Sequence, residues 1–201
     1  MRVLVACEFS GIVRDAFAAR GHDAWSCDLL PTERPGPHIQ GDVLPHLEDG
    51  WDLMIAHPPC TYLTNAGVCH LHSVPTRLGN LPKVHGAERW EAMRQAAAFF
   101  NTLKAAPIQR IAIENPIPHK YARALIGNYA QRYQPWQFGD GETKATCLWL
   151  KNLPPLMDTI TDTRRERRVH LATPSPDRWK VRSRTPQGVA EAMAEQWGGL
   201  Q

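Results

Sequence analysis

MRVLVACEFSGIVRDAFAARGHDAWSCD, residues 1–28, holds a strand, a turn, a helix and a second strand in succession. Residues 2–6, RVLVA, form a short apolar run that predicts a strand, and the turn after it contains a glycine. Residues 12–21, IVRDAFAARG, place apolar side chains at helical spacing and close on a glycine. Residues 22–28 predict a second strand that ends in Asp28. This order of elements predicts two parallel strands of a doubly wound sheet.

The same alternation of strands and helices continues along the chain. Apolar runs that break at prolines predict strands, and apolar side chains at helical spacing predict helices. We expect strands at 51–60, 110–116 and 147–150, helices at 87–105, 119–127 and 185–198, a long loop at 61–86 and an irregular stretch from 151 to about 180. The prediction is one α/β domain with a Rossmann-like, doubly wound and mostly parallel sheet.

Composition points to an intracellular globular protein. The chain has 201 residues, 43% of them apolar, and no apolar run approaches the roughly 18 residues of a membrane helix. The N-terminus lacks the layout of a signal peptide. Five cysteines, an odd number, favour reduced thiols over a disulfide framework. We therefore expect a cytoplasmic, monomeric protein with no membrane partner.

Several strands end in chemically active residues. The strand ends carry Phe-Ser-Gly at 9–11, Pro-Pro-Cys at 58–60 and Glu-Asn-Pro at 114–116, while Asp28 and Asp42 close two further apolar stretches. In an open α/β sheet, ligands bind beyond the carboxyl ends of the strands. A strand-end Asp alone is usually a helix cap, and a lone Cys is usually a small buried side chain. The ordered combination is far more specific than its parts.

In this order the segments resemble the DNA cytosine-C5 methyltransferase family. CEFSGIVRDAF (7–17) is similar to that family's Asp-Leu-Phe-x-Gly-x-Gly turn, PPCTYLTNAG (58–67) to its Pro-Cys loop, and IENP (113–116) to its Glu-Asn-Val strand end. RTPQGVAEAMA (184–194) looks like the family's last motif. The chain is also similar to short phage-borne members that keep the catalytic half and little else.

The resemblance implies a class I fold that depends on S-adenosyl-L-methionine and transfers a methyl group to C5 of cytosine in DNA. Cys60 would add to C6 of the ring as a thiolate, and Glu114 would support that addition at N3. Cys60 must then be exposed and thiolate-prone. The family's Gln-x-Arg-x-Arg strand has no counterpart, because GDGETKATCLWL (139–150) occupies its place, and Lys144 is the stand-in for the arginine.

The resemblance also implies which residues bind the cofactor and the substrate. Asp28 would bind the ribose hydroxyls, and Asp42 the adenine amino group. The other cofactor contacts are Phe9, Ser10, Gly11 and Pro58, and the substrate contacts are Asn115, Pro116, Thr146, Arg164, Arg165, Arg167 and Arg168. The arginine cluster among them fits either a solvated loop or a phosphate contact.

Three segments follow from this assignment. Residues 1–150 would form the cofactor-binding catalytic domain, 151–184 a reduced DNA-contact segment, and 185–201 a C-terminal helix that packs back on the domain. The middle segment is too short for a full recognition domain. It is rich in basic side chains and poor in Asn and Gln, which predicts a short or relaxed sequence context and activity on single-stranded DNA.

Three alternatives remain open at this stage. The enzyme could act on a free pyrimidine nucleotide, or it could transfer a different group from a modified sulfonium cofactor. The chain could also be a non-catalytic nucleic-acid-binding module, although the presence of Cys60 together with Glu114 argues against that.

The other cysteines are assigned no catalytic role. Cys69, His70 and His72 suggest zinc, but their spacing is too tight for a usual site, so we expect no metal and a catalytic loop that faces the substrate. We expect core packing for Cys7, Cys27 and Cys147.

Overall fold

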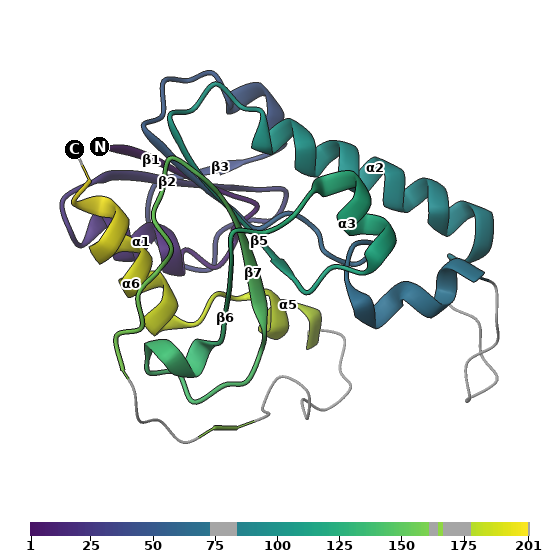
Figure 1. Ribbon diagram of the computed structural model, residues 1–201. Helices are drawn as coiled ribbons and strands as arrows, with labels where there is room; N and C mark the ends of the chain where they lie inside the picture. Colours follow the sequence, from purple (N-terminus) through teal and green to yellow (C-terminus); the bar gives the residue numbers. More distant parts are fainter. Residues whose placement is uncertain (73–83, 161–164, 167–177, 201) are drawn as a thin grey trace.

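The computed structural model describes residues 1–72, 84–160, 165–166 and 178–200 (Figure 1). The strands are β1 (Arg2–Ala6), β2 (Asp23–Asp28), β3 (His38–Gln40), β4 (Leu53–Ala56), β5 (Arg110–Pro116), β6 (Gln131–Tyr133) and β7 (Thr146–Lys151). The α-helices are α1 (Ile12–Ala18), α2 (Gly86–Lys104), α3 (Lys120–Ile126), α5 (Arg178–Ser183) and α6 (Gln187–Gly198), and the 3-10 helices are η1 (Leu44–His46), η2 (Asn65–His72) and η3 (Pro135–Phe138).

A seven-stranded sheet in the order β3-β2-β1-β4-β5-β7-β6 forms the centre of the molecule. Neighbouring strands are parallel except where β7 pairs antiparallel with β5 and with β6. The register places Ala6 beside Cys27 and Ala56, and Ala56 beside Ile113. The carboxyl ends of β1, β2, β4 and β5 therefore meet at one edge. This confirms the predicted single-domain α/β fold with a doubly wound, mostly parallel sheet.

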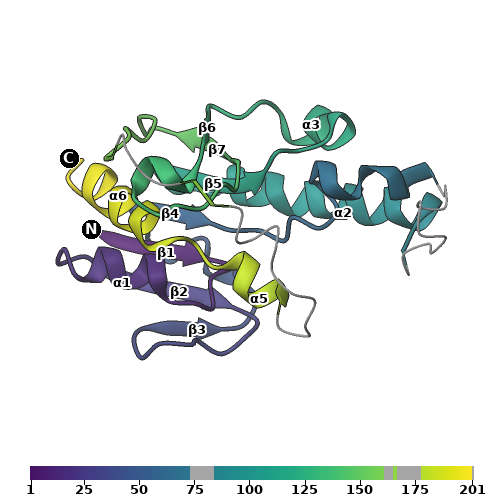
Figure 2. The same ribbon diagram turned by 90° about the horizontal axis from the view of Figure 1, so that it is seen from below.

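Helices cover both faces of the sheet (Figure 2). Val5 belongs to the core that β1 forms with α1 and α6, whereas its neighbour Leu4 belongs to the core on the side of α2 and α3. Both side chains are fully buried, which explains why β1 is continuously apolar rather than alternating. Cys27 and Cys147 are buried in the α2-side core, as predicted.

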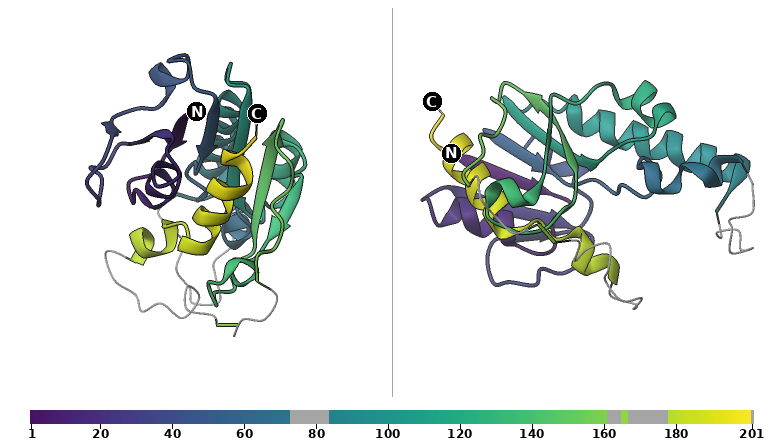
Figure 3. Two further views of the ribbon diagram at one scale, coloured as in Figure 1. Left: turned by 90° about the vertical axis from the view of Figure 1, so that its left-hand side faces the viewer. Right: turned by 60° about the horizontal axis from the view of Figure 1, so that its bottom comes forward.

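The last helix, α6, packs against the first, α1. Trp197 on α6 is fully buried, and its indole N–H donates to the Pro154 carbonyl at 3.0 Å. Gly198 lies directly against the ring of His22, the residue before β2. The two ends of the described chain therefore lie at the same end of the sheet, opposite the edge where the parallel strands terminate (Figure 3).

The long helix α2 has one buried face, with Met93, Ala97, Phe100 and Leu103 in the core. Its N-terminal half extends beyond the sheet together with η2 (Figure 2). Neither α2 nor any other helix in the described ranges has both the length and the apolar character to cross a membrane.

Several elements differ from the sequence expectations. The edge strands β3 and β6 were not predicted, because three residues are too few to show a period and these strands exist through pairing with β2 and β7. The predicted long loop at 61–86 is wrong for residues 65–72, which form η2 against α2, while residues 73–83 lie outside the described residues. The predicted irregular stretch up to about residue 180 is wrong where α5 begins at Arg178.

Candidate active site

The two central catalytic candidates lie at the ends of neighbouring strands. The pairing of β4 with β5 sets Ala56 beside Ile113, so the next residues, His57 and Glu114, are neighbours as well. Nδ1 of His57 is 3.2 Å from Oε2 of Glu114. Cys60 follows on the same loop and is close enough for the Glu114 charge to act on its thiol. The structure thus brings the predicted nucleophile and the predicted acid to one edge of the sheet.

Side chains from two helices hold the Cys60 loop in place. The buried guanidinium of Arg89 on α2 donates to the Thr61 carbonyl at 3.0 Å. His119, the N-cap of α3, donates from Nε2 to the Tyr62 carbonyl, also at 3.0 Å. The backbone after Cys60 is therefore fixed by buried polar contacts, and sequence reasoning had assigned no role to either side chain.

Cys60 is half-buried in this loop. Burial raises the pKa of its thiol above the ordinary value, and the Lys144 ammonium opposes this only in part. The expectation of an exposed, thiolate-prone cysteine is therefore wrong for this structure, because the loop folds inward and desolvation exceeds the attraction of one cation. Pro58, a predicted cofactor contact, is buried.

Glu114 is surrounded by polar side chains in a buried setting. Besides His57, the Tyr133 hydroxyl donates to Oε2 at 3.2 Å. Burial raises the pKa of Glu114, but the hydrogen bond and charge of His57 and the charge of Lys144 outweigh it and hold that pKa below its ordinary value. Burial lowers the pKa of His57, but Glu114 and then Glu8 raise it above its ordinary value. His57 and Glu114 thus each favour the charged form of the other.

Lys144 completes this cluster from the loop before β7. Its ammonium influences Cys60, His57 and Glu114, and Nζ donates to the Arg182 carbonyl in α5 at 2.9 Å. The three predicted catalytic side chains are therefore gathered in one place.

The predicted substrate residues of β5 and β7 lie opposite one another. Pro116 pairs with Thr146, and Asn115 pairs with Cys147. Asn115 and Thr146 are buried, and the Thr146 hydroxyl donates to the Lys144 carbonyl at 3.0 Å. In the part of the chain that the structure describes, Oδ1 of Asn115 has no hydrogen-bond partner. Asn115 is thus buried next to Glu114 on β5, and the Thr146 hydroxyl fixes the backbone at Lys144.

The turn after β1 is buried and satisfies its own polar groups. Oε1 of Glu8 accepts the Val13 N–H at 2.7 Å and the Ser10 hydroxyl at 3.0 Å. Gly11 has φ +72°, and a Cβ there would meet the Arg14 guanidinium. The Ser10 hydroxyl is engaged with Glu8, so a ligand at this turn would meet mainly backbone. Sequence reasoning gave Glu8 no role, although an acid directly after a strand and before a helix was a usable signal.

The two predicted cofactor acids flank Cys7. Asp28 is half-buried and accepts the Leu30 N–H at 2.9 Å, while Asp42 is exposed and accepts the Leu44 N–H at 3.1 Å. Burial and then the neighbouring charges, Asp28 foremost, raise the pKa of Cys7 to about 12. The expected core position of Cys7 is only partly right, because it follows β1 with φ 58° and is partly buried against the α2-side core rather than within it.

Helix α5 lies at the edge where the parallel strands end (Figure 2). The Trp179 ring is 6.1 Å from the Phe9 ring, measured between centroids. The Arg184 guanidinium donates to both carboxylate oxygens of Glu33 at 2.9 and 2.7 Å. The helix and the residue after it therefore cover the Phe9 turn, and Phe9 itself is buried.

Of the predicted phosphate-contacting arginines, Arg165 is described and is exposed. Its guanidinium lies 4.1 Å above the Trp136 ring. Arg164, Arg167 and Arg168 lie outside the described residues.

The Cys69 segment forms part of η2. Cys69 Sγ is 3.7 Å from His70 Nδ1, while the His72 ring packs edge-on against Trp90 and Tyr121. The expected loop conformation is therefore wrong here, because the segment is helical, while His72 is exposed and touches rings of α2 and α3. Within the described ranges, no three His, Cys, Asp or Glu side chains lie close enough to hold a metal ion.

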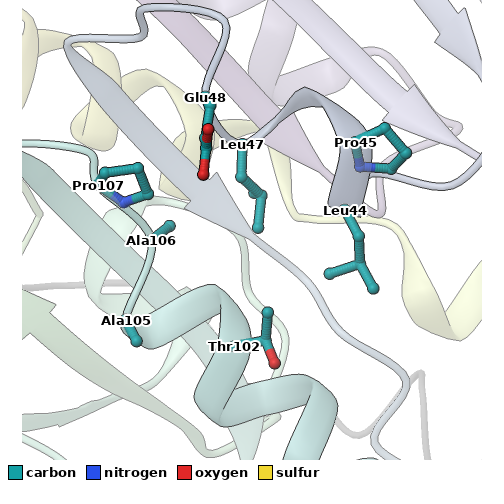
Figure 4. A pocket seen from close by; sticks show the side chains of 8 residues that line it. All are labelled: Leu44, Pro45, Leu47, Glu48, Thr102, Ala105, Ala106 and Pro107. Carbon is teal, nitrogen blue, oxygen red and sulfur yellow. The ribbon is translucent and has the colours of Figure 1, made fainter.

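A pocket of about 560 Å³ lies away from this cluster, between η1 and the end of α2 (Figure 4). The segments around it lead into the amino ends of β4 and β5, at the other end of the sheet. The pocket is lined by Leu44, Pro45, Leu47, Glu48, Thr102, Ala105, Ala106 and Pro107, none of which was predicted as a site residue.

Two further site residues were missed in the sequence. His57 had a signal, because it is the polar residue that ends the apolar run LMIA directly before Pro-Pro-Cys. Tyr133 had none, because its position beside Glu114 depends on the pairing of an edge strand with β7.

The strand order, with its single reversed strand, is that of a Rossmann-like methyltransferase fold. Among solved structures, the chain is similar to a candidate DNA modification methyltransferase encoded within an E. coli prophage, with a TM-score of 0.50 and 13% identity over 87% of this chain and 55% of that one. It is also similar to the S. pombe Dnmt2 methyltransferase, with a TM-score of 0.45 and 17% identity over 77% of this chain and 51% of that one. The Entamoeba histolytica methyltransferase EhMeth has a TM-score of 0.45 and 12% identity over 83% of this chain and 57% of that one.

The chain spans little more than half the length of these proteins. No family model and no curated protein matches the sequence. At these identities the likeness concerns the fold.

Proposed function

We propose that this protein is a methyltransferase that moves a methyl group from S-adenosyl-L-methionine to C5 of cytosine in DNA, through a covalent bond between Cys60 and C6. The observation that carries the proposal is the cluster of Cys60, Glu114 and Lys144. The thiol comes from the loop after β4, the acid from β5 and the cation from the loop before β7, and they meet at the edge of the sheet where the parallel strands end.

The chemistry explains why these groups belong together. C5 of cytosine is too weak a nucleophile to attack a methyl sulfonium unless a thiolate first adds to C6. Cys60 would supply that thiolate, Glu114 would support the addition at N3, and Lys144 would favour negative charge on the sulfur. After transfer, loss of the C5 proton breaks the bond between Sγ and C6 and restores Cys60.

The residues at the ends of the first strands fit the cofactor, which supplies an electrophilic methyl group when bound. Asp28 is a half-buried carboxylate that accepts the Leu30 N–H through Oδ1, and its two oxygens keep acceptor capacity for the hydroxyls of a ribose. Asp42 is exposed nearby and suits an exocyclic amino group. Gly11 gives the backbone a left-handed turn, and the Arg14 guanidinium fills the space that a Cβ would take there.

We propose DNA as the substrate because cations lie beside the nucleophile. The charges of both Lys144 and Arg182 act on the Cys60 thiol, and Arg182 is exposed. Phosphates of a nucleic acid would interact with such cations. The same cations would also suit the phosphate of a free pyrimidine nucleotide, which is the second candidate substrate.

Labelled S-adenosyl-L-methionine, incubated separately with duplex DNA, single-stranded DNA and dCMP, tests both candidates. We expect transfer to DNA, loss of transfer in Cys60→Ser, and normal transfer in the matched control Cys69→Ser, because Cys69 is exposed on η2. DNA that contains 5-fluorocytosine should trap an adduct that mass spectrometry maps to Cys60. Transfer to dCMP alone would make the nucleotide the substrate, and a product mass other than one methyl group would identify a different transferred group. Full activity of Cys60→Ser would overturn the mechanism.

A further inference from the structure

We propose that His57 is a positioning residue that shares one proton with Glu114. The pair, rather than a lone carboxylic acid, then gives this proton to the ring nitrogen N3 of the pyrimidine and takes it back. The inference rests on the proposed function and assigns a role to a side chain that the resemblance to the cytosine-C5 family left without one.

The geometry holds the two side chains in a dry, fixed contact. Nδ1 of His57 lies 3.2 Å from Oε2 of Glu114, and the two side chains are only 11% and 10% exposed. The backbone N–H of His57 donates to the Ala6 carbonyl at 2.9 Å, which anchors the imidazole to the sheet. Tyr133 donates to the same carboxylate oxygen from the other side. Neither partner can turn away without stranding a buried polar group.

The second nitrogen of the His57 ring, Nε2, is not used in the contact with Glu114. Nε2 of His57 is buried, and among the described residues it has no hydrogen-bond partner. A buried ring nitrogen of this kind usually serves a ligand or an ordered water. The free nitrogen suits a group that exchanges its proton during a reaction.

Three charged side chains act on the imidazole, and one neutral hydroxyl contacts its partner Glu114. Glu114 comes from β5 and Glu8 from the end of β1, while the Lys144 ammonium comes from the loop before β7. Tyr133 on β6 is neutral, because burial raises its pKa well above the ordinary value. Two carboxylates and one ammonium together favour a protonated imidazole beside an ionised Glu114.

The proton of the His57–Glu114 pair supplies what a lone carboxylic acid lacks near neutral pH. A carboxylic acid in water is ionised near pH 7 and has no proton to give. When Sγ of Cys60 bonds to C6, the thiol proton leaves to solvent, N3 takes one proton from the pair, and the pair remains as imidazole and carboxylate. When the C5 proton later leaves to solvent and the Sγ–C6 bond breaks, N3 returns its proton to the pair and the thiolate regains one from solvent. The protein ends the cycle unchanged.

The pair can be tested without any activity by NMR titration of the imidazoles, with the His57 signal assigned from His57→Asn. We expect His57 in the wild-type protein to titrate above the ordinary pH range of an imidazole. In Glu114→Gln its titration should move down by at least about one pH unit, because burial then acts without the nearby charge. In the control Tyr133→Phe, His57 should stay protonated. A His57 that is neutral by about pH 6, or unaffected by Glu114→Gln, would overturn the proposal.

The catalytic use of the proton is tested by single-turnover methyl transfer as a function of pH. Asn keeps a hydrogen-bond donor toward Glu114 but carries no titratable proton. The alkaline fall of the rate should therefore move down by at least about one pH unit in His57→Asn and stay in place in Tyr133→Phe. If His57→Asn lowers the rate equally at every pH and the alkaline fall stays where it is in the wild-type protein, His57 has a structural role only. Absence of transfer by the wild-type protein would overturn the proposed function, and the NMR titration would still decide whether the pair exists.

Discussion

At the scale of single residues, the reactivity of Cys60 depends on opposing neighbours. Desolvation and the Glu114 carboxylate favour the thiol, whereas Lys144 and Arg182 favour the thiolate. The resting cysteine is therefore a thiol, held close to the cation that would stabilise its reactive form. In the proposed reaction, substrate binding has to shift the protonation equilibrium of Cys60 toward the thiolate.

The first prediction removes the cation. Lys144→Met should raise the pKa of Cys60 further, because desolvation is then opposed by less positive charge. Alkylation of Cys60 by iodoacetamide, followed by mass spectrometry across a pH series, should shift to higher pH. Lys144→Arg is the matched control and should leave the profile nearly unchanged. An identical profile in Lys144→Met would show that the ammonium does not act on the thiol.

The second prediction concerns the cofactor acids. Asp28→Ala should weaken binding of S-adenosyl-L-methionine by roughly 1–3 kcal/mol, because the ribose hydroxyls would lose a half-buried acceptor. Asp42→Ala should weaken it by less, since Asp42 is exposed and its site is closer to water. Isothermal titration calorimetry measures both. Equal affinity of Asp28→Ala and wild type would move the ribose site elsewhere.

At the scale of elements, the first turn is enclosed by parts of the chain that lie far away in sequence. The loop after β2 contributes Glu33, whose N–H donates to the Phe9 carbonyl at 2.8 Å. Helix α5 contributes Trp179 against the Phe9 ring, and Arg184 after it pairs with Glu33. A cofactor at the Phe9 turn would therefore lie beside α5, and α5 would separate it from solvent.

The third prediction tests that cover. Trp179→Ala should speed dissociation of S-adenosyl-L-methionine several-fold, because the ring that packs on Phe9 is lost. Val181→Ala is the matched control, since Val181 is exposed on the same short helix. Stopped-flow displacement gives the rates. Unchanged dissociation in Trp179→Ala would show that α5 does not close the cofactor site.

The fourth prediction concerns the turn itself. Gly11→Ala should destabilise the fold more than Gly21→Ala, although both glycines have left-handed φ values, +72° and +80°. The conformational penalty of about 1–2 kcal/mol applies to both. The added Cβ meets the Arg14 guanidinium only at residue 11, whereas the space around Gly21 is open. Urea denaturation compares the free energies of unfolding, and equal losses would contradict the contact.

At the scale of the whole molecule, the His57–Glu114 pair links stability to pH. The folded pKa of His57 is raised, so its contribution is complete below the unfolded value of 6.5 and is lost as pH rises through the folded pKa. The folded pKa of Glu114 is lowered, so its contribution is complete above the unfolded value of 4.5 and is lost as pH falls through the folded pKa. Both contributions are therefore complete between these two unfolded values.

The fifth prediction follows from this window. The free energy of unfolding should be highest between about pH 4.5 and 6.5 as far as this pair decides it, and should fall on both sides. Glu114→Gln should flatten both slopes, because the titrating carboxyl is gone and His57 loses the stronger of the two carboxylates that raise its pKa. Urea denaturation across a pH series, with the surface variant Glu91→Gln as control, provides the comparison. Unchanged slopes in Glu114→Gln would contradict the ion pair.

Local patterns were enough to predict most of the architecture. The apolar run before Cys7, the helical spacing after Gly11 and the proline breaks around Cys60 and Glu114 depend only on neighbouring residues. For the same reason the strand ends could be identified, and with them Cys60, Glu114 and Asp28. Strands that follow one another in this pattern place those ends at one edge.

The rest was decided by contacts between residues distant in the chain. The register of β4 on β5 sets His57 against Glu114, and the pairing of β6 with β7 brings Tyr133 to the same carboxylate. The packing of α5 covers Phe9, and the inward fold of the loop keeps Cys60 a thiol. Sequence by itself determined which chemical groups stand at the strand ends, because periodicity is local. Tertiary structure alone decided their protonation and their partners, because desolvation and charge act through space rather than along the chain.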